Sequence, residues 1–264
     1  MPTGRHQSAA PQSVTRVIAI LEALCAASGP LSLAELSRSV GAPKSSLAAL
    51  LAGLADEGFV TAAEGTWRLG PGAFGLGAAL NQARRQLDVP ELIRTSLRRL
   101  AEASGETALY AVADAEGQTI TYVDVAESRN AVRFAVAVGD RRPLYATSAG
   151  RAILSAMNGP ECDAYLGNVK TVKLAPATLT GRDQLAEAIG VARANGVAQT
   201  VDQAAEGVTG TAAVVRDAAG AVLGALVVAA PSSRWQDRRA LLAELVRAEA
   251  ESLSRSLGYR PREV

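Results

Sequence analysis

Apolar residues in the first sixty positions repeat at intervals of three and four, which is typical of amphipathic helices. The spacing predicts helices over residues 13–28, 32–40 and 43–57, separated by Gly-Pro and Gly-containing breaks. Ser32 with Glu35 three residues later matches the capping-box pattern at the start of the second helix. The third helix carries its apolar residues on one side: Leu47, Leu50, Leu51 and Leu54.

The segment FVTAAEGTWRLG, residues 59–70, predicts two short strands around a Glu64-Gly65 turn. Three short helices followed by a hairpin favour a winged helix-turn-helix, in which the third helix enters the major groove of DNA. A small helical bundle that serves only in protein contacts fits the same pattern.

Further along the chain, residues 70–86 and 88–105 predict a connecting helix and an amphipathic helix. From Glu106 the apolar period changes to two, which indicates strands. The pattern predicts strands over 107–114, 118–127, 131–138, 196–203, 209–217 and 221–231, and helices over 148–157, 160–167, 181–196 and 234–258. Hairpin turns between the strands favour an α+β domain with an antiparallel sheet and helices packed on it.

Composition narrows the function classes. The chain has 264 residues, with 27 Lys+Arg against 26 Asp+Glu, so DNA binding would need a local basic patch. The lone histidine, His6, lies in a polar tail, which argues against histidine catalysis and metal sites. Cys25 and Cys162 lack metal-ligand spacing, and no apolar run reaches a membrane span. We therefore expect a reduced cytoplasmic protein without a cofactor, a metal or a membrane partner.

Three stretches together resemble the IclR family of bacterial transcription regulators. They are SVTRVIAILEAL with LSLAELSRSVGAPKSSLAALLAGLADEGFV; WRLGPGAFGLG; and VGDRRPLYATSAGRAILSAM with DQAAEGVTGTAAVV and LGALVVAAPSSR. The resemblance implies a DNA-binding repressor or activator, dimeric or tetrameric on palindromic operator DNA, with a GAF-like effector-binding domain. It divides the chain into a disordered tail over 1–12, a winged helix-turn-helix over 13–70, a linker helix over 71–87, an effector domain over 88–258 and a tail over 259–264.

The resemblance also places the DNA contacts. It implies contacts from the third helix and the wing: Lys44, Ser45, Ser46, Ala48, Ala49, Thr66 and Arg68. Family members usually carry bulkier polar residues, often arginine, where this chain has Ala48 and Ala49. We therefore expect the helix to be positioned mainly by phosphates, with the tail residues Arg5 and His6 in a minor groove. Alternatively, the serines only cap the helix and the alanines make no contact.

For the effector pocket the resemblance implies nine lining residues: Ala131, Phe134, Arg142, Ser148, Ala149, Val208, Gly210, Val227 and Ala229. Members that bind small polar acids carry serine or cysteine where this chain has Gly210, Val227 and Ala229. We therefore expect a larger, partly apolar or aromatic carboxylate, held near Ser148 and Ala149. For Val227 and Ala229 an ordinary core role fits equally well.

Other charged residues are open to two interpretations. Arg133 or Arg142 could add charge to the pocket or lie in solvent at a strand end. Asp202 and Glu206 could form a carboxylate pair, although a structural or solvated role fits better without a nearby nucleophile. In the linker, Gly70, Gly72, Gly75 and Gly77 suggest a hinge and dimer contact, or a tight helix–helix seam.

Three functions remain in view at this stage. The first is a ligand-responsive transcription regulator. The second is a small-molecule sensor whose head has lost sequence-specific DNA binding and acts through protein contacts. The third, an enzyme on the α+β domain, is disfavoured because the sequence offers neither a metal cluster nor an activated nucleophile.

Overall fold

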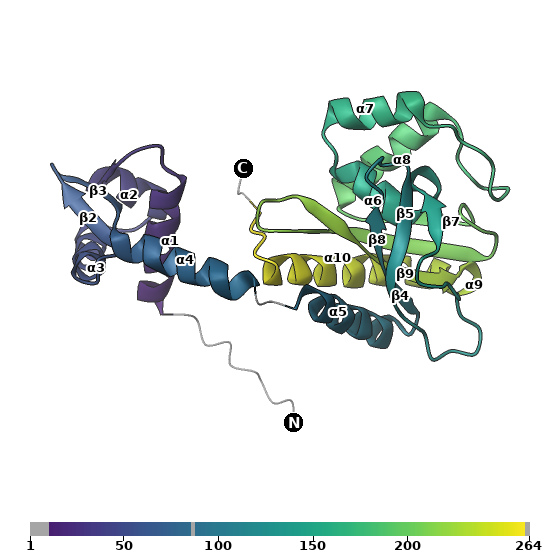
Figure 1. Ribbon diagram of the computed structural model, residues 1–264, viewed down its shortest axis with the longest axis horizontal. Coiled ribbons are helices and arrows are strands. Elements are labelled where there is room, and N and C mark those ends of the chain that lie inside the picture. The colour runs from purple at the N-terminus through teal and green to yellow at the C-terminus, as the bar shows by residue number, and fades with distance from the viewer. Residues whose placement is uncertain (1–10, 86–87, 262–264) are drawn as a thin grey trace. The chain divides into compact units, whose positions relative to one another are not determined.

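The computed structural model describes residues 11–85 and 88–261. By its internal contacts the chain divides into two compact units, Met1–Leu87 and Asp88–Val264 (Figure 1). The tail predicted over 1–12, with Arg5 and His6, lies outside the described residues up to residue 10. Its last residue begins the first helix, at Gln12.

The first unit has the element order expected of a winged helix-turn-helix. It contains α1 (Gln12–Ala26), β1 (Leu31–Ser32), α2 (Leu33–Val40), α3 (Lys44–Asp56), β2 (Val60–Ala63), β3 (Thr66–Leu69) and α4 (Pro71–Arg85). The strands form an antiparallel sheet in the order β1-β3-β2. The strand β1 was not predicted, because two residues carry no periodic signal and depend on β3 for pairing.

Local sequence signals explain the helix boundaries in this unit. The Ser32 hydroxyl accepts a hydrogen bond from the Glu35 N–H, and the Glu35 carboxylate accepts one from the Ser32 N–H, which completes the predicted capping box. Gly41 ends α2 in the left-handed conformation. Buried apolar residues from α1, α2, α3, β2 and the turn before α3 form one core: Ile20, Leu24, Leu36, Ala42, Leu47, Leu51, Leu54 and Val60.

The glycines at the start of the linker helix have two kinds of surroundings. In the linker, Gly70 and Gly72 lie directly against the backbone of Gly58, where a side chain would collide. Gly75 and Gly77 have open space instead. The start of α4 is therefore packed tightly against the turn at Gly58 rather than against another helix, and the hinge and dimer contact stay predictions.

The second unit is built on a six-stranded antiparallel sheet. Its helices are α5 (Val89–Ser104), α6 (Ser148–Ala156), α7 (Gly159–Asn168), α8 (Arg182–Asn195), α9 (Ser232–Trp235) and α10 (Arg239–Ser256), with short 3-10 helices η1 (Leu144–Ala146) and η2 (Gln236–Arg238). Its strands are β4 (Thr107–Ala113), β5 (Thr119–Ala126), β6 (Arg141–Pro143), β7 (Ala198–Val201), β8 (Val208–Arg216) and β9 (Val222–Pro231). They pair in the order β6-β5-β4-β9-β8-β7.

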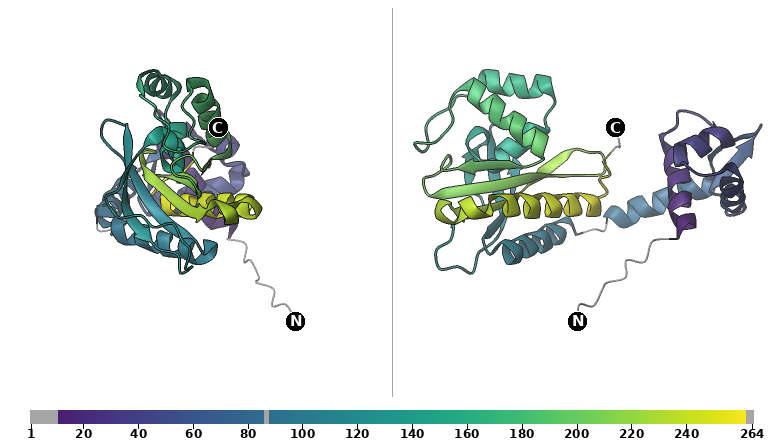
Figure 2. Two further views of the ribbon diagram at one scale, coloured as in Figure 1. Left: turned by 90° about the vertical axis from the view of Figure 1, so that its right-hand side faces the viewer. Right: turned by 180° about the vertical axis from the view of Figure 1, so that it is seen from behind.

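Both faces of this sheet are covered by helices, so its central strands are apolar on both sides. On β9, Ala225, Val227 and Ala229 pack with α6 and its neighbours, whereas Leu226 and Val228 pack with α5 and α10. Figure 1 and Figure 2 show α5 and α10 along one face and α6 to α8 on the other. The α+β class with an antiparallel sheet is confirmed.

The strand predicted over 131–138 is wrong. This segment joins no sheet, and the neighbouring strand position is taken by β6, which pairs with residues 119–121 of β5. The apolar alternation nevertheless has a structural cause, because Phe134 and Val136 pack against the core beside α6. Val132 and Val138 point into solvent. The alternation of apolar residues therefore correctly indicated that one side of this segment is buried, but it did not indicate a hydrogen-bonded strand.

The closing helix was also predicted too long at its start. Residues 234–238 belong to α9 and η2, and α10 itself begins at Arg239. Arg234 turns back toward the sheet there, where its guanidinium forms a bidentate pair with the buried carboxylate of Glu106, at 2.9 and 2.7 Å. This ion pair raises the pKa of Arg234.

Candidate ligand cavity and DNA-binding surface

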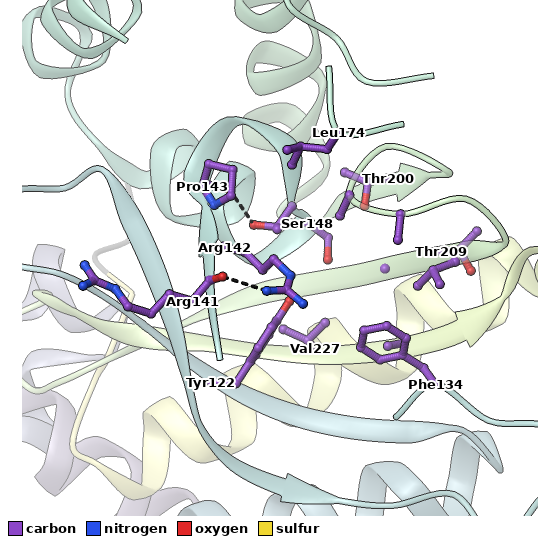
Figure 3. A pocket seen from close by; sticks show the side chains of 16 residues that line it. Tyr122, Phe134, Arg141, Arg142, Pro143, Ser148, Leu174, Thr200, Thr209 and Val227 are labelled. Atoms are coloured by element: carbon purple, nitrogen blue, oxygen red, sulfur yellow. Dashed lines mark hydrogen bonds between the residues drawn. The ribbon is translucent and has the colours of Figure 1, made fainter. Parts of the chain in front are cut away.

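One cavity of the second unit, about 410 Å³ in volume, lies between the start of α6 and strands β8 and β9 (Figure 3). This volume falls in the range typical of small-molecule sites. Seven of the nine residues predicted for the effector pocket line it: Phe134, Arg142, Ser148, Val208, Gly210, Val227 and Ala229.

Gly210 has a steric role that its sequence context did not reveal. A Cβ atom at this position would collide with the Ser148 hydroxyl, and would also lie 3.4 Å from the Thr200 hydroxyl oxygen. The missing side chain therefore lets two hydroxyl groups approach β8 from α6 and β7. Gly210, Val227 and Ala229 offer no side-chain donor, and the hydroxyls of Ser148 and Thr200 on the facing elements supply donors instead.

The cavity contains polar groups that no other described residue satisfies. Within the described residues, the hydroxyls of Ser148, Thr200 and Tyr122 form no hydrogen bond. Burial raises the pKa of Tyr122 to about 12, so its hydroxyl remains a neutral donor at physiological pH. A ligand with oxygen acceptors could therefore pair with all three.

The start of α6 adds backbone donors. Thr147 caps the helix by accepting a hydrogen bond from the Gly150 N–H at 3.0 Å. The N–H groups of Ser148 and Ala149 have no acceptor among the residues described. Free N–H groups at a helix start attract anions. Gly150 is needed for this geometry because a side chain there would collide with the backbone of Leu144 in η1.

Two arginines lie at the mouth of the cavity. Arg142 lies 3.8 Å from the Asp140 carboxylate and donates to the carbonyl of Arg141. Arg141 is engaged with Asp114 and Thr119. Because its ion pair is long and exposed, Arg142 is the arginine available to a ligand carboxylate.

The opposite side of the cavity is apolar and comes partly from the irregular segment before β6. Phe134 lies across from Ser148 and Arg142 in Figure 3. Its carbonyl accepts a hydrogen bond from the buried Thr107 hydroxyl at 2.9 Å, and Arg234 donates to the carbonyl of Val132 at 3.0 Å. These two bonds fix the position of the aromatic ring without a strand ladder.

Two predicted pocket residues lie outside the cavity. The Ala149 side chain is fully buried in the core, because the second position of α6 faces the sheet, and only its N–H faces the helix start. Ala131 is exposed in the irregular segment, since no strand turns it inward. Arg133 also lies outside and pairs with Glu127.

Asp202 and Glu206, considered from the sequence as a carboxylate pair, have structural or solvated roles. Asp202 has a positive φ of 53°, and its carboxylate accepts hydrogen bonds from the Gly207 N–H and the Ser232 hydroxyl. Its oxygen Oδ1 is thus occupied within the fold, and Glu206 is exposed. Sequence reasoning missed Tyr122, Leu174 and Thr200 as lining residues, because they come from strands and a loop that only the sheet topology brings together.

The first unit presents a smooth, exposed helix. On α3, Lys44, Ser45, Ala48 and Ala49 are exposed, whereas the leucines face the core. Neither serine caps the helix, since Pro43 occupies the N-cap without a side-chain bond. The Ser46 hydroxyl instead accepts a hydrogen bond from Arg16 of α1 at 3.1 Å.

The wing residues lie on the hairpin of β2 and β3. Arg68 is exposed and donates from Nε to the Thr61 hydroxyl at 3.2 Å. The Thr66 hydroxyl donates to the carbonyl of Ala63 at 2.8 Å and stabilises the turn. Arg68 therefore keeps its terminal nitrogens free of partners within the described chain.

Comparisons with known proteins agree with this arrangement. A family model described as the IclR helix-turn-helix domain matches residues 13–64, and one described as the bacterial transcriptional regulator IclR C-terminal domain matches residues 81–255. The chain belongs to the IclR family. Its members are transcriptional regulators that bind DNA through the first of these domains.

Individual IclR-family relatives cover nearly the whole chain. It is 31% identical over 253 residues to the HTH-type transcriptional repressor AllR of Salmonella typhimurium, covering 95% of this chain and 91% of the relative. AllR of Escherichia coli K12 is 31% identical over 252 residues, covering 94% and 91%.

Solved IclR-family structures share the fold. A protein of Silicibacter sp. TM1040, described as an IclR transcriptional regulator, has a TM-score of 0.76 at 29% identity, over 95% of this chain and 98% of that one. The repressor BlcR of Agobacterium tumefaciens has a TM-score of 0.72 at 26% identity, over 96% and 99%. Among the described helices, none is both long and apolar enough to cross a membrane.

Proposed function

We propose that the effector of this IclR-family regulator is a small, partly apolar or aromatic carboxylate that binds in the cavity at the start of α6 and modulates operator binding. The observation that carries this proposal is the division of the cavity into two ends. One end offers Arg142, the Ser148 hydroxyl and free N–H groups, the other offers the Phe134 ring, and Val227 adds apolar surface to the wall.

Calorimetry on the intact protein tests the ligand class. The panel contains aromatic acids, medium-length aliphatic acids, and polar acids of two or three carbons. The proposal predicts that the first two groups bind at least about tenfold more tightly, since only they cover the apolar end. Tight binding of the smallest polar acids alone would contradict it.

For DNA, we propose that α3 meets the duplex with its amino-terminal end. Lys44 and Ser45 are exposed there, and free N–H groups favour phosphate. Ala48 and Ala49 leave a smooth surface that can touch thymine methyl groups, while Ser46, Thr66 and Arg68 complete the contact from the helix and the wing. We expect modest affinity, loose base preference and steep salt dependence.

Lys44→Gln tests this placement. Operator fragments are first isolated by genome-wide capture with the purified protein, and affinities are measured by anisotropy over a range of salt concentrations. Loss of one phosphate contact should reduce the slope of log K against log salt by about 1 for every sequence tested. Lys170→Gln in the second unit is the matched control. An unchanged slope in the Lys44 variant would contradict the placement.

We also propose that the protein acts as a homodimer or a tetramer. Exposed apolar side chains gather on two helices of the first unit: Val14 and Ile18 on α1, and Phe74, Leu76 and Leu80 on α4. A monomer would leave this surface in water, and a second copy would cover it symmetrically.

A second function is favoured by the exposed face of α3, which carries few hydrogen-bonding side chains. Ala48 and Ala49 place no hydrogen-bonding side chain toward DNA, which favours a ligand sensor with weakened operator specificity that acts through protein contacts. Genome-wide capture separates the two functions. Enrichment of a defined sequence supports the regulator, and uniform recovery supports the sensor.

Three further proposals concern the location of the protein, its lack of catalytic activity and its domain limits. We propose that the protein acts in the cytoplasm, where its DNA lies, and catalyses no reaction on its ligand. The proposed domain limits, 13–70, 71–87 and 88–258, place the linker helix as a separate segment between the two functional parts. Conversion of any bound acid into a product would contradict the non-catalytic role.

A further inference from the structure

A second cavity lies in the effector-binding unit and takes no part in the function described so far. It has a volume of about 380 Å³ and lies among α6, α8, β7 and the start of α10. Its polar lining consists of Arg151, Gln184, Glu187, Asn195, Gln199, Gln203 and Arg239. Two cations and four amides face one acidic side chain there.

Arg151 is the deepest of these residues, with 2% of its surface exposed. Its Nε donates to the Tyr145 carbonyl at 2.9 Å, and its Nη2 donates to the Gln203 side-chain carbonyl. Both acceptors are neutral, and within the described residues no carboxylate forms an ion pair with it. The guanidinium is thus a buried charge without a counter-ion, which is an unfavourable arrangement unless an anion joins it.

Burial lowers the pKa of Arg151 to about 10. This value remains well above neutrality, so the side chain is charged at physiological pH. Its Nη1 donates to no residue in the described part of the chain. The cavity that Arg151 lines is therefore the place where an anion could meet this charge.

Arg239 supplies a second positive charge at the same cavity. Its guanidinium lies 5.5 Å from the centre of the Trp235 ring and donates from Nε to the Gln199 side-chain carbonyl at 3.0 Å. It too has a neutral partner, and no ion pair to a described carboxylate. The ring and the amide hold the guanidinium in a fixed orientation.

We propose that this cavity binds a small anion carrying a phosphate or carboxylate group, as a second site distinct from the effector cavity. Arg151 and Arg239 neutralise the anion, and the exposed residues Gln184 and Asn195 offer amide donors. Glu187 weakens binding and disfavours larger polyanions. The proposal does not depend on the identity of the effector.

Three shared segments connect the two cavities. On α6, Ser148 lines the effector cavity and Arg151 lines the second one. On β7, Thr200 lines the effector cavity and its neighbour Gln199 lines the second one. In the following loop, Ala204 lines the effector cavity and Gln203 lines the second one. An anion at one site therefore acts on elements that build the other, which is the physical requirement for coupling between sites.

Calorimetry on the intact chain tests the site with inorganic phosphate in one arm and succinate in the other, at constant ionic strength. We expect saturable binding of at least one of them. Arg239→Gln should weaken it by about tenfold, whereas Glu187→Gln should strengthen it severalfold by removing repulsion. Arg94→Gln, at an exposed position on α5, is the matched control and should leave the affinity unchanged.

These variants avoid the buried Arg151, whose replacement would disturb folding. Because Arg239 and Glu187 do not line the effector cavity, the opposite shifts in affinity would assign the anion to the second cavity. Absence of saturable binding in both arms would overturn the proposal. Failure of either variant to shift affinity in its stated direction would overturn it as well.

Discussion

At the scale of single residues, two glycines decide the shape of the proposed effector cavity. Gly150 lets α6 begin directly against η1, and Gly210 leaves room for the hydroxyls of Ser148 and Thr200. From sequence, Gly210 could be recognised only as a place where other family members carry a donor. Its steric role depends on the packing of β8 against α6, which no local sequence pattern predicts.

Gly210→Ala should abolish effector binding in calorimetry, or weaken it by at least about tenfold. The added methyl group collides with the Ser148 hydroxyl and either displaces it or occupies the cavity. Gly190→Ala on α8, where the surrounding space is open, is the matched control and should bind normally. Normal affinity in the Gly210 variant, with the fold intact by circular dichroism, would place the ligand elsewhere.

At the scale of elements, the sequence predicted those whose boundaries are set by their own residues. The capping box of α2, the Gly41 and Gly105 ends of α2 and α5, and the Glu64-Gly65 turn all depend on short-range chemistry. Elements that depend on distant partners were missed or misjudged. Examples are β1, which exists through β3, and residues 131–138, which are tied down by Thr107 and Arg234.

The capping box makes a prediction about α2. Ser32→Ala removes a hydroxyl acceptor for the Glu35 N–H and should destabilise the helix by about 1 kcal/mol. Hydrogen exchange of the α2 amides in the intact chain measures this loss. Faster exchange confined to the first unit is expected, and unchanged exchange would show that the cap contributes nothing.

The same contact predicts a pH dependence. The Ser32 backbone N–H, followed by its hydroxyl, lowers the pKa of Glu35 below the ordinary 4.5. The stabilising effect is therefore complete above pH 4.5 and is lost as pH falls through the lowered value. The protection factors of the α2 amides, which correct for the slower intrinsic exchange at low pH, should therefore fall in that acidic window in the wild type. The Ser32→Ala variant should show a weaker dependence, because its hydroxyl no longer stabilises the ionised carboxylate.

At the scale of the whole molecule, the family and the division into a DNA-binding part and an effector-binding part could be predicted from motif order alone. The composition of the cavity could not, because Tyr122, Leu174 and Thr200 reach it from a strand, a loop and another strand. Assembly also belongs to this scale. Assembly into a dimer or tetramer is suggested by apolar side chains that are exposed to solvent, such as Phe74 and Leu80 on α4.

A Phe74→Glu, Leu80→Glu double variant should sediment as a smaller species than the wild type. Charges on the exposed face of α4 oppose its burial against a second copy. Because the proposed dimer would place two linked heads on two half-sites, operator affinity should fall by about a hundredfold when the dimer is lost. Val172→Glu, an equally exposed apolar position in the other unit, should change neither property. Wild-type sedimentation of the double variant would exclude this surface from the assembly.

The central claim is that occupancy of the cavity beside α6 controls DNA binding by the helix-turn-helix unit. The most direct test is the anisotropy-derived affinity for the captured operator, with and without a saturating amount of the tightest-binding acid, in the wild type and in Gly210→Ala. The account predicts a change of about fivefold or more in the wild type and none in the variant. Equal operator affinity in the presence and absence of ligand in the wild type, or an undiminished ligand effect in the variant, would contradict it.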